Sequence, residues 1–235
     1  MTFPEMARTK KDKPSAPRGR PPRINRATQD DSRGRLLDAA IHLFARYGYD
    51  PVSTVAVAKA TGLTQSMVHY HFGSKEKLWK EAIRKLMRDR GATFPIGKMD
   101  LRDLDHISRL KFITRTYVKA NAADPNLARI MMHEGMAKSP RLNWLVEEYV
   151  QTAFSAFDAA IKDAIAAGVI RNLPVRDVTN IIVAAGAMTF SLGALLQQLY
   201  KIDILSPKHV DSLTDSIVTV LFQGLESVPR SEMGG

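Results

Sequence analysis

A helix-turn-helix is predicted by residues 53–75, which read STVAVAKATGLTQSMVHYHFGSK. Ser53 is suited to be a helix N-cap, because its hydroxyl can accept a free backbone N–H of the first turn. Gly62 can take the left-handed conformation that ends the first helix. Thr64 stands in the same cap position before the second helix. The stretch therefore predicts two short helices joined by a tight turn.

The outer face of the second helix carries short or polar side chains once Val68 and Phe72, four residues apart, are turned inward. Such side chains suit the donors, acceptors and thymine methyl groups that base edges present in a major groove. The residues predicted to contact DNA in this region are Ser53, Thr54, Thr64, Gln65, Ser66, Met67, His69, Tyr70 and His71. Lys75 follows in the first turn of the next helix, where the helix dipole and a cation both favour a phosphate.

This segment resembles the DNA-binding region of the tetracycline-repressor (TetR) family. That family begins with a helix bearing a leucine–alanine–phenylalanine stripe, as residues 36–49 do with LLDAAIHLFARYGY. Its next motif is an aromatic residue, His-Phe and Ser-Lys, as in YHFGSK at residues 70–75. The likeness covers about residues 33–87 and departs at His69, where the family usually has a phosphate-contacting tyrosine. It implies an all-α fold, with an N-terminal three-helix helix-turn-helix domain joined to a larger helical ligand-binding and dimerisation domain.

Composition and charge agree with a nucleic-acid partner. The chain has 235 residues, a formal net charge of +10 and a calculated pI near 9.9, which favours polyanions as partners. It has no cysteine, so disulfides and thiolate metal sites are excluded. A run of about 18 apolar residues, which a membrane span needs, does not occur, and the N-terminus lacks a signal-peptide core. We therefore expect a soluble, cytoplasmic protein with no membrane partner.

Residues 1–27 are predicted to be a disordered basic arm. They hold eight lysines and arginines, two acidic residues and five prolines, with too few large apolar residues to form a core. Arg18, Arg20 and Arg23 lie in PRGRPPR, whose Arg-Gly-Arg-Pro core is similar to an AT-hook, an element that places arginines in an A·T-rich minor groove. A generic basic tail that binds DNA without sequence preference is the alternative.

The rest of the chain is predicted to form two helical domains. Residues 28–90 form the DNA-binding domain with its linking helix, and residues 91–235 form an effector-binding and dimerisation domain, because glycines and Pro95 mark a break after Arg90. Further helices are predicted over residues 125–137, 140–167, 175–200 and 207–224. Three of them start with proline directly after a capping residue, at Asp124-Pro125, Ser139-Pro140 and Ser206-Pro207.

Large apolar side chains of the second domain are candidates for an effector pocket, which the resemblance implies; plain core packing is the alternative for each. They are Phe112, Tyr117, Met131, Met132, Trp144, Phe154, Met188 and Phe190. Small residues at 184–187 and 191–194 allow helices to approach closely. With the last helix they predict a homodimer seam, as the resemblance also implies; packing inside one subunit is the alternative.

Catalysis and metal binding are not predicted. His69 and His71 are two residues apart, so a helix turns them about 200° from one another and they cannot share a metal. No phosphate-binding glycine loop or nucleophile elbow occurs, and no cofactor is expected. The sequence thus predicts a dimeric transcriptional regulator that binds an inverted-repeat operator in double-stranded DNA, and the TetR resemblance implies that it is a repressor released by a small-molecule effector. The alternatives are an architectural DNA-binding dimer without effector control, and a helical carrier or enzyme.

Overall fold

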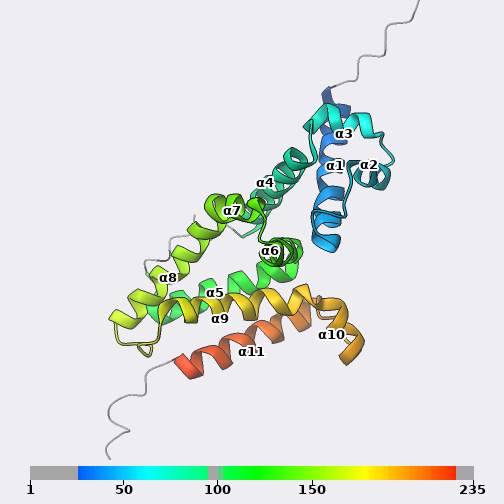
Figure 1. Ribbon diagram of the computed structural model, residues 1–235. Coiled ribbons are helices and arrows are strands. Elements are labelled where there is room, and N and C mark those ends of the chain that lie inside the picture. The colour runs from blue at the N-terminus through cyan, green and yellow to red at the C-terminus, as the bar shows by residue number, and fades with distance from the viewer. Residues whose placement is uncertain (1–25, 95–100, 102, 226–235) are drawn as a thin grey trace, which may run out of the picture.

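The computed structural model describes residues 26–94, 101 and 103–225, and each secondary-structure element in them is a helix (Figure 1). In chain order they are α1 (Arg26–Tyr47), α2 (Thr54–Thr61), α3 (Gln65–Phe72), α4 (Lys75–Thr93), α5 (His106–Ala123), α6 (Asn126–Ala137), α7 (Pro140–Leu145), the π-helical turn η2 (Val146–Val150), α8 (Gln151–Ala166), α9 (Val175–Ser191), α10 (Gly193–Tyr200) and α11 (Pro207–Leu225). The predicted all-α class is confirmed.

The predicted helix-turn-helix is confirmed as α2 and α3, which lie with α1 at one end of the molecule (Figure 1). Ser53 Oγ accepts a hydrogen bond from the Ala56 N–H at 3.0 Å, and Gly62 ends α2 with a left-handed φ of 69°. Val68 and Phe72 are buried in the core that α1 and α4 share with them. Because Val68 and Phe72 turn one side of α3 into this core, the opposite side of α3 is exposed to solvent.

The helix α4 links this head to the rest of the molecule and continues past the predicted boundary at residue 91 to Thr93. The core around α1 also contains Ile130 of α6 and Leu145 of α7. Trp144 meets Trp79 of α4 edge to face, with ring centroids 5.5 Å apart. Helices from beyond the boundary therefore complete the core of the head, and the exact domain limits stay a prediction.

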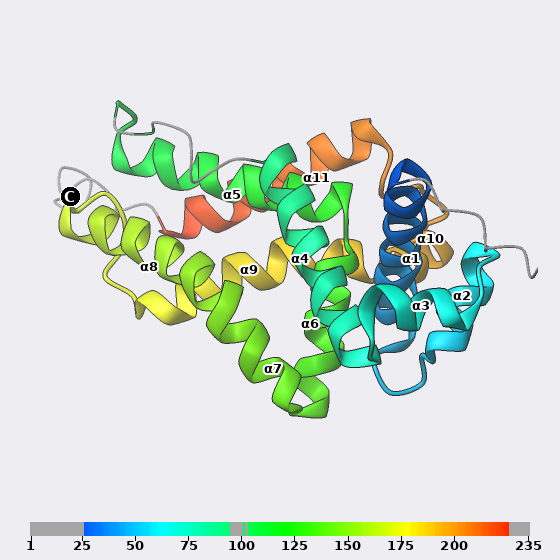
Figure 2. The same ribbon diagram turned by 90° about the horizontal axis from the view of Figure 1, so that it is seen from above.

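The body is built on α5 and α9, which pack against one another, with α8 and α11 packed along them (Figures 1 and 2). Its main core contains Leu110, Phe157, Ile182 and Phe222. The helix α6 lies between α1 and α9, so it touches both the head and the body.

The prediction of one helix over residues 175–200 is wrong, because the chain bends by 68° between α9 and α10. Ser191 turns its hydroxyl back to the Ala187 carbonyl at 2.8 Å, and small residues of this kind accompany helix kinks. Arg129 of α6 donates to the carbonyls of Phe190 and Ser191 at 3.4 and 3.2 Å. The bend is therefore supported by a cation from another helix, which satisfies carbonyls that a continuous helix would use itself.

No single helix in the described part of the chain is long and apolar enough to cross a membrane; α9 and α10 pass that test only as a bent pair.

Candidate nucleic-acid interface

The outer face of α3 is exposed over its whole length. Gln65, Ser66, His69 and Tyr70 are exposed, and 66% of the Tyr70 surface is open to solvent. Met67, also predicted to contact DNA, is half-buried. The face therefore offers an amide, a hydroxyl, an imidazole and a phenol, which are side chains able to bond to base edges and phosphates.

The start of α3 differs from the prediction in one detail. Thr64 occupies the N-cap position with an extended backbone, but its hydroxyl makes no cap bond and instead lies 2.7 Å from the Ser66 hydroxyl. This pair keeps two of the predicted DNA contacts close together on the exposed surface, although the helix start is held without a side-chain cap.

Gln65 and His69 are joined by hydrogen bonds along α3 and to α2. Gln65 Nε2 lies 3.4 Å from Thr54 Oγ1 and 3.3 Å from His69 Nε2. His69 Nδ1 lies 3.1 Å from the carbonyl of Gly73. Because each bond restricts a side chain that is otherwise free to rotate, the polar face is partly preorganised before any DNA arrives.

His71 is turned away from this face. It is half-buried, its Nε2 has no hydrogen-bond partner, and its ring lies 5.9 Å from that of Phe72. Burial, aided by the charge of Arg33, lowers the pKa of His71 below its usual value. These observations favour a packing role for His71, and the predicted DNA contact stays a prediction.

Lys75 is held against the protein rather than directed freely outward. Its Nζ donates to the Asp50 carbonyl at 3.0 Å and lies 4.2 Å from the centre of the Tyr49 ring. Burial lowers the pKa of Lys75, opposed by the carboxylate of Asp50 and assisted by the charge of Arg141. A phosphate contact would therefore require the amine to give up the Asp50 carbonyl, and that contact stays a prediction.

The Tyr49 ring joins Lys75 to the body. The Arg141 guanidinium carbon, at the start of α7, lies 3.6 Å from the centre of this ring. Arg141 Nε also bonds both carboxylate oxygens of Glu134 at 3.2 Å, and Ser139 donates its hydroxyl to the same carboxylate. Burial raises the pKa of Tyr49, although the neighbouring Arg141 charge opposes the rise.

We call Glu134, Arg141, Tyr49 and Lys75 the junction. The sequence analysis missed it, since no local pattern connects residues that lie on the α1–α2 loop, α4, α6 and α7. The only available signal was Ser139-Pro140-Arg141, a helix start that leaves an arginine in the first turn. The junction connects the first turn of α4, next to the exposed α3 face, with α6 and α7.

Both parts of the chain match models of one protein family. Residues 36–91 match "Bacterial regulatory proteins, tetR family", and residues 107–221 match "Tetracyclin repressor-like, C-terminal domain".

The chain belongs to the TetR family.

Individual TetR-family relatives are distant. The regulator BetI of Agrobacterium fabrum is 37% identical over 57 residues, 24% of this chain and 28% of BetI. The repressor KstR2 of Rhodococcus jostii is 25% identical over 148 residues, 61% of this chain and 72% of KstR2. The match to BetI thus spans little more than a quarter of that relative.

Solved TetR-family structures share the fold. KstR2 of Mycobacterium tuberculosis, a ketosteroid transcriptional regulator, aligns over 84% of this chain and 96% of its own, with 18% identity and a TM-score of 0.66. FadR of Bacillus subtilis, solved with stearoyl-CoA, aligns over 81% of this chain and 98% of its own, with 19% identity and a TM-score of 0.58. At these identities the likeness supports the fold alone.

The residues predicted to line a TetR-type effector pocket lie in separate surroundings. Met131 and Trp144 pack on the core of the head. Tyr117 packs edge to face on Phe157 in the body, with centroids 5.6 Å apart, and Phe190 is completely buried in a third cluster beside α10. Of the others, Phe154 is half-buried, and Met132 and Met188 are exposed. The structure does not bring the set together, and an effector site formed by these residues stays a prediction.

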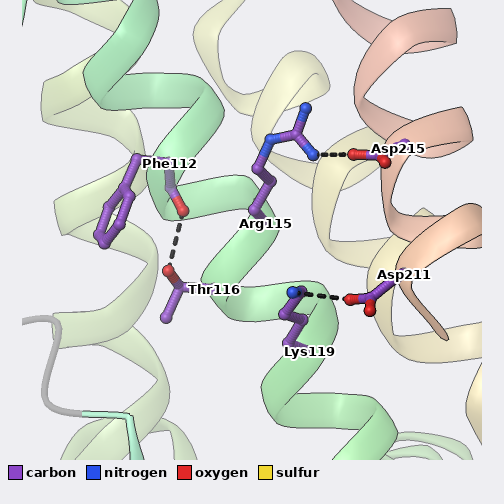
Figure 3. Close-up of a pocket in the computed structure, with 6 residues that line it drawn as sticks. All are labelled: Phe112, Arg115, Thr116, Lys119, Asp211 and Asp215. Carbon is purple, nitrogen blue, oxygen red and sulfur yellow. Dashed lines mark hydrogen bonds and ion pairs between the residues drawn. The ribbon is translucent and has the colours of Figure 1, made fainter. Parts of the chain in front are cut away.

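Phe112 lies instead beside a surface groove of about 480 Å³ between α5 and α11 (Figure 3). The groove is lined by Phe112, Arg115, Thr116, Lys119, Asp211 and Asp215. Arg115 pairs with Asp215, and Lys119 Nζ lies 2.8 Å from Asp211. Each charged side chain of the lining is thus paired across the two helices, so these charges tie α11 to α5.

Two further predictions remain as they were. Arg18, Arg20 and Arg23 of the basic arm lie outside the described residues. Within the described residues, no group of three His, Asp or Glu side chains is placed to hold a metal ion.

Proposed function

We propose that this TetR-family chain binds an inverted-repeat operator in double-stranded DNA as a homodimer and represses transcription until a small-molecule effector releases it. The observation that carries the proposal is the exposed polar face of α3, held outward by buried Val68 and Phe72. A helix of this kind, second in a helix-turn-helix, enters a major groove and reads base edges there.

The homodimer is supported by large exposed apolar side chains on the last helices. Ile181, Met188, Leu195 and Leu199 of α9 and α10, and Val220 of α11, are each at least 49% exposed. Large apolar side chains left open to solvent can serve an interaction site, and these are the candidates for the seam. A two-fold dimer would present two α3 helices to successive major grooves about 34–36 Å apart.

Two of the small residues that suggested the seam pack inside the subunit. An added Cβ on Gly186 would meet the Tyr117 ring at 2.9 Å, and one on Gly193 would meet Ile204 at 3.3 Å. Both glycines therefore permit close packing inside one subunit. The proposed seam rests on the exposed large side chains instead.

Effector control is supported by the way the body meets the head. An effector that prefers one arrangement of α6 and α7 would shift the population of the head through the junction, because Glu134 and Arg141 belong to those helices.

Operator binding is tested by a gel shift on DNA fragments that flank the gene, in a large excess of random duplex. A repressor should stay bound to one inverted repeat in the presence of this competitor. Gln65→Ala should weaken that complex by about 1–3 kcal/mol, and it should change binding to random DNA much less. Loss of the complex to competitor would favour an architectural DNA-binding dimer. Little affinity for any duplex at physiological salt would favour a carrier or an enzyme.

A further inference from the structure

The amide of Gln65, on the exposed face of α3, is held from two sides. Its Nε2 faces Thr54 Oγ1 at 3.4 Å and His69 Nε2 at 3.3 Å. An amide presents N–H donors at one end and a carbonyl acceptor at the other, so the end that these partners engage decides which end is offered to DNA.

The backbone fixes which nitrogen of His69 carries its proton. His69 Nδ1 lies 3.1 Å from the Gly73 carbonyl, which can only accept a hydrogen bond. Nδ1 must therefore carry the proton, and in a neutral imidazole the other nitrogen, Nε2, is then an acceptor.

This tautomer sets the orientation of Gln65. If the amide carbonyl faced His69 Nε2, two lone pairs would oppose one another, so the NH₂ group must face the ring. One N–H of Gln65 is then used on His69, and the second points to the hydroxyl of Thr54. The carbonyl oxygen Oε1 is the part of the amide left to face the major groove.

An outward carbonyl distinguishes bases by their exocyclic groups. In the major groove, adenine and cytosine present an amino donor, whereas guanine and thymine present a keto acceptor at the corresponding place. We propose that the pair formed by Gln65 and His69 reads an amino base, adenine or cytosine, and rejects guanine and thymine at one operator position. This proposal rests on the proposed operator-binding function and assigns His69 as a positioning residue for Gln65.

The proposal also accounts for a histidine at position 69. It stands where the family usually has a tyrosine, and a phenol could not accept from Gln65 while donating to the Gly73 carbonyl through a separate atom. The imidazole has two nitrogens with opposite roles, so it can pass the polarity of a fixed backbone carbonyl to the amide four residues earlier.

The test is binding-site selection from a random duplex library with the full-length chain, followed by measured affinities for the four bases at single positions. The position read by Gln65 is located as the one whose preference disappears in Gln65→Ala. At that position the wild-type chain should favour adenine or cytosine over guanine and thymine by about tenfold. His69→Ala should reduce this ratio to about twofold or less, because the amide is then free to turn over.

A reversal variant and a matched control sharpen the result. His69→Lys can only donate, so it should draw Oε1 inward and shift the preference at that same position toward guanine or thymine. Gln151→Ala, at an exposed glutamine at the start of α8 and outside the interface, should leave the preference unchanged.

A wild-type preference for a keto base, or an amino preference that persists in His69→Ala, would overturn the inference while leaving operator binding intact. Failure to enrich any sequence would instead overturn the proposed function, and the inference with it.

Discussion

Replacing Arg141 by Met should strongly destabilise the folded chain, because it leaves a buried carboxylate without its cation. The Glu134 side chain is 2% exposed and that of Arg141 is 15% exposed. Removing one partner of a buried ion pair costs about 3–5 kcal/mol. Because Arg141 is partly exposed, we expect a loss at the lower end of this range, about 3 kcal/mol of unfolding free energy. The lost contact with the Tyr49 ring, at 3.6 Å, adds about 1 kcal/mol.

The expected total for Arg141→Met is therefore about 4 kcal/mol, which for a domain of this size lowers Tm by roughly 10 °C. Thermal and urea unfolding of Arg141→Met, of Glu134→Met and of the double variant Arg141→Met/Glu134→Met measures this loss of stability. The double variant should lose less than Arg141→Met alone, because an apolar replacement of a whole buried pair is often close to neutral.

A matched control is Arg84→Met. The Arg84 side chain is 45% exposed in its pair with Glu81, and its guanidinium carbon lies 5.5 Å from the centre of the Trp144 ring, so its loss should cost no more than about 2 kcal/mol. The reasoning is refuted if Arg141→Met costs no more than this control, or if the double variant is at least as unstable as Arg141→Met.

Four further outcomes are expected. Met188→Glu or Val220→Glu should convert the dimer to monomer in sedimentation and weaken operator binding, because each places a charge in the proposed apolar seam; an intact dimer would place the seam elsewhere. Lys75→Ala should lower the salt dependence of DNA binding by about one per site, because its amine is predicted to leave the Asp50 carbonyl for a phosphate; an unchanged slope would show that the amine stays bonded to the protein. The lowered pKa of His71 means that the unfolded chain binds a proton more readily, so its contribution to stability is complete above about pH 6.5 and is lost as the pH falls toward the folded-state value. Unfolding of His71→Gln from pH 5 to 8 should lack this part of the slope, and an identical pH profile would contradict it. Deleting residues 1–27 should reduce affinity and abolish a preference for A·T-rich flanks; equal weakening on A·T-rich and G·C-rich flanks would leave only a non-specific electrostatic role for the arm.

Local chain chemistry was enough to predict the helix-turn-helix. Ser53 caps α2 through an N–H three residues away, and Gly62 closes it on the carbonyls of Ala58 and Lys59. These interactions join residues within about one helical turn, so their pattern is visible in the sequence. The inward spacing of Val68 and Phe72 likewise determined which side of α3 faces solvent.

The tertiary structure decided the features whose partners are far apart in the chain. The bend after Ser191 depends on Arg129, 62 residues earlier, and the small residues near it pack against Tyr117 and Ile204 within the subunit. Periodicity predicts a continuous helix there, because it records which residues are apolar and small but not which distant side chain meets them. The junction on Tyr49 is of the same kind: it exists because folding brings α6 and α7 onto the head, so only three-dimensional packing could pair Arg141 with that ring.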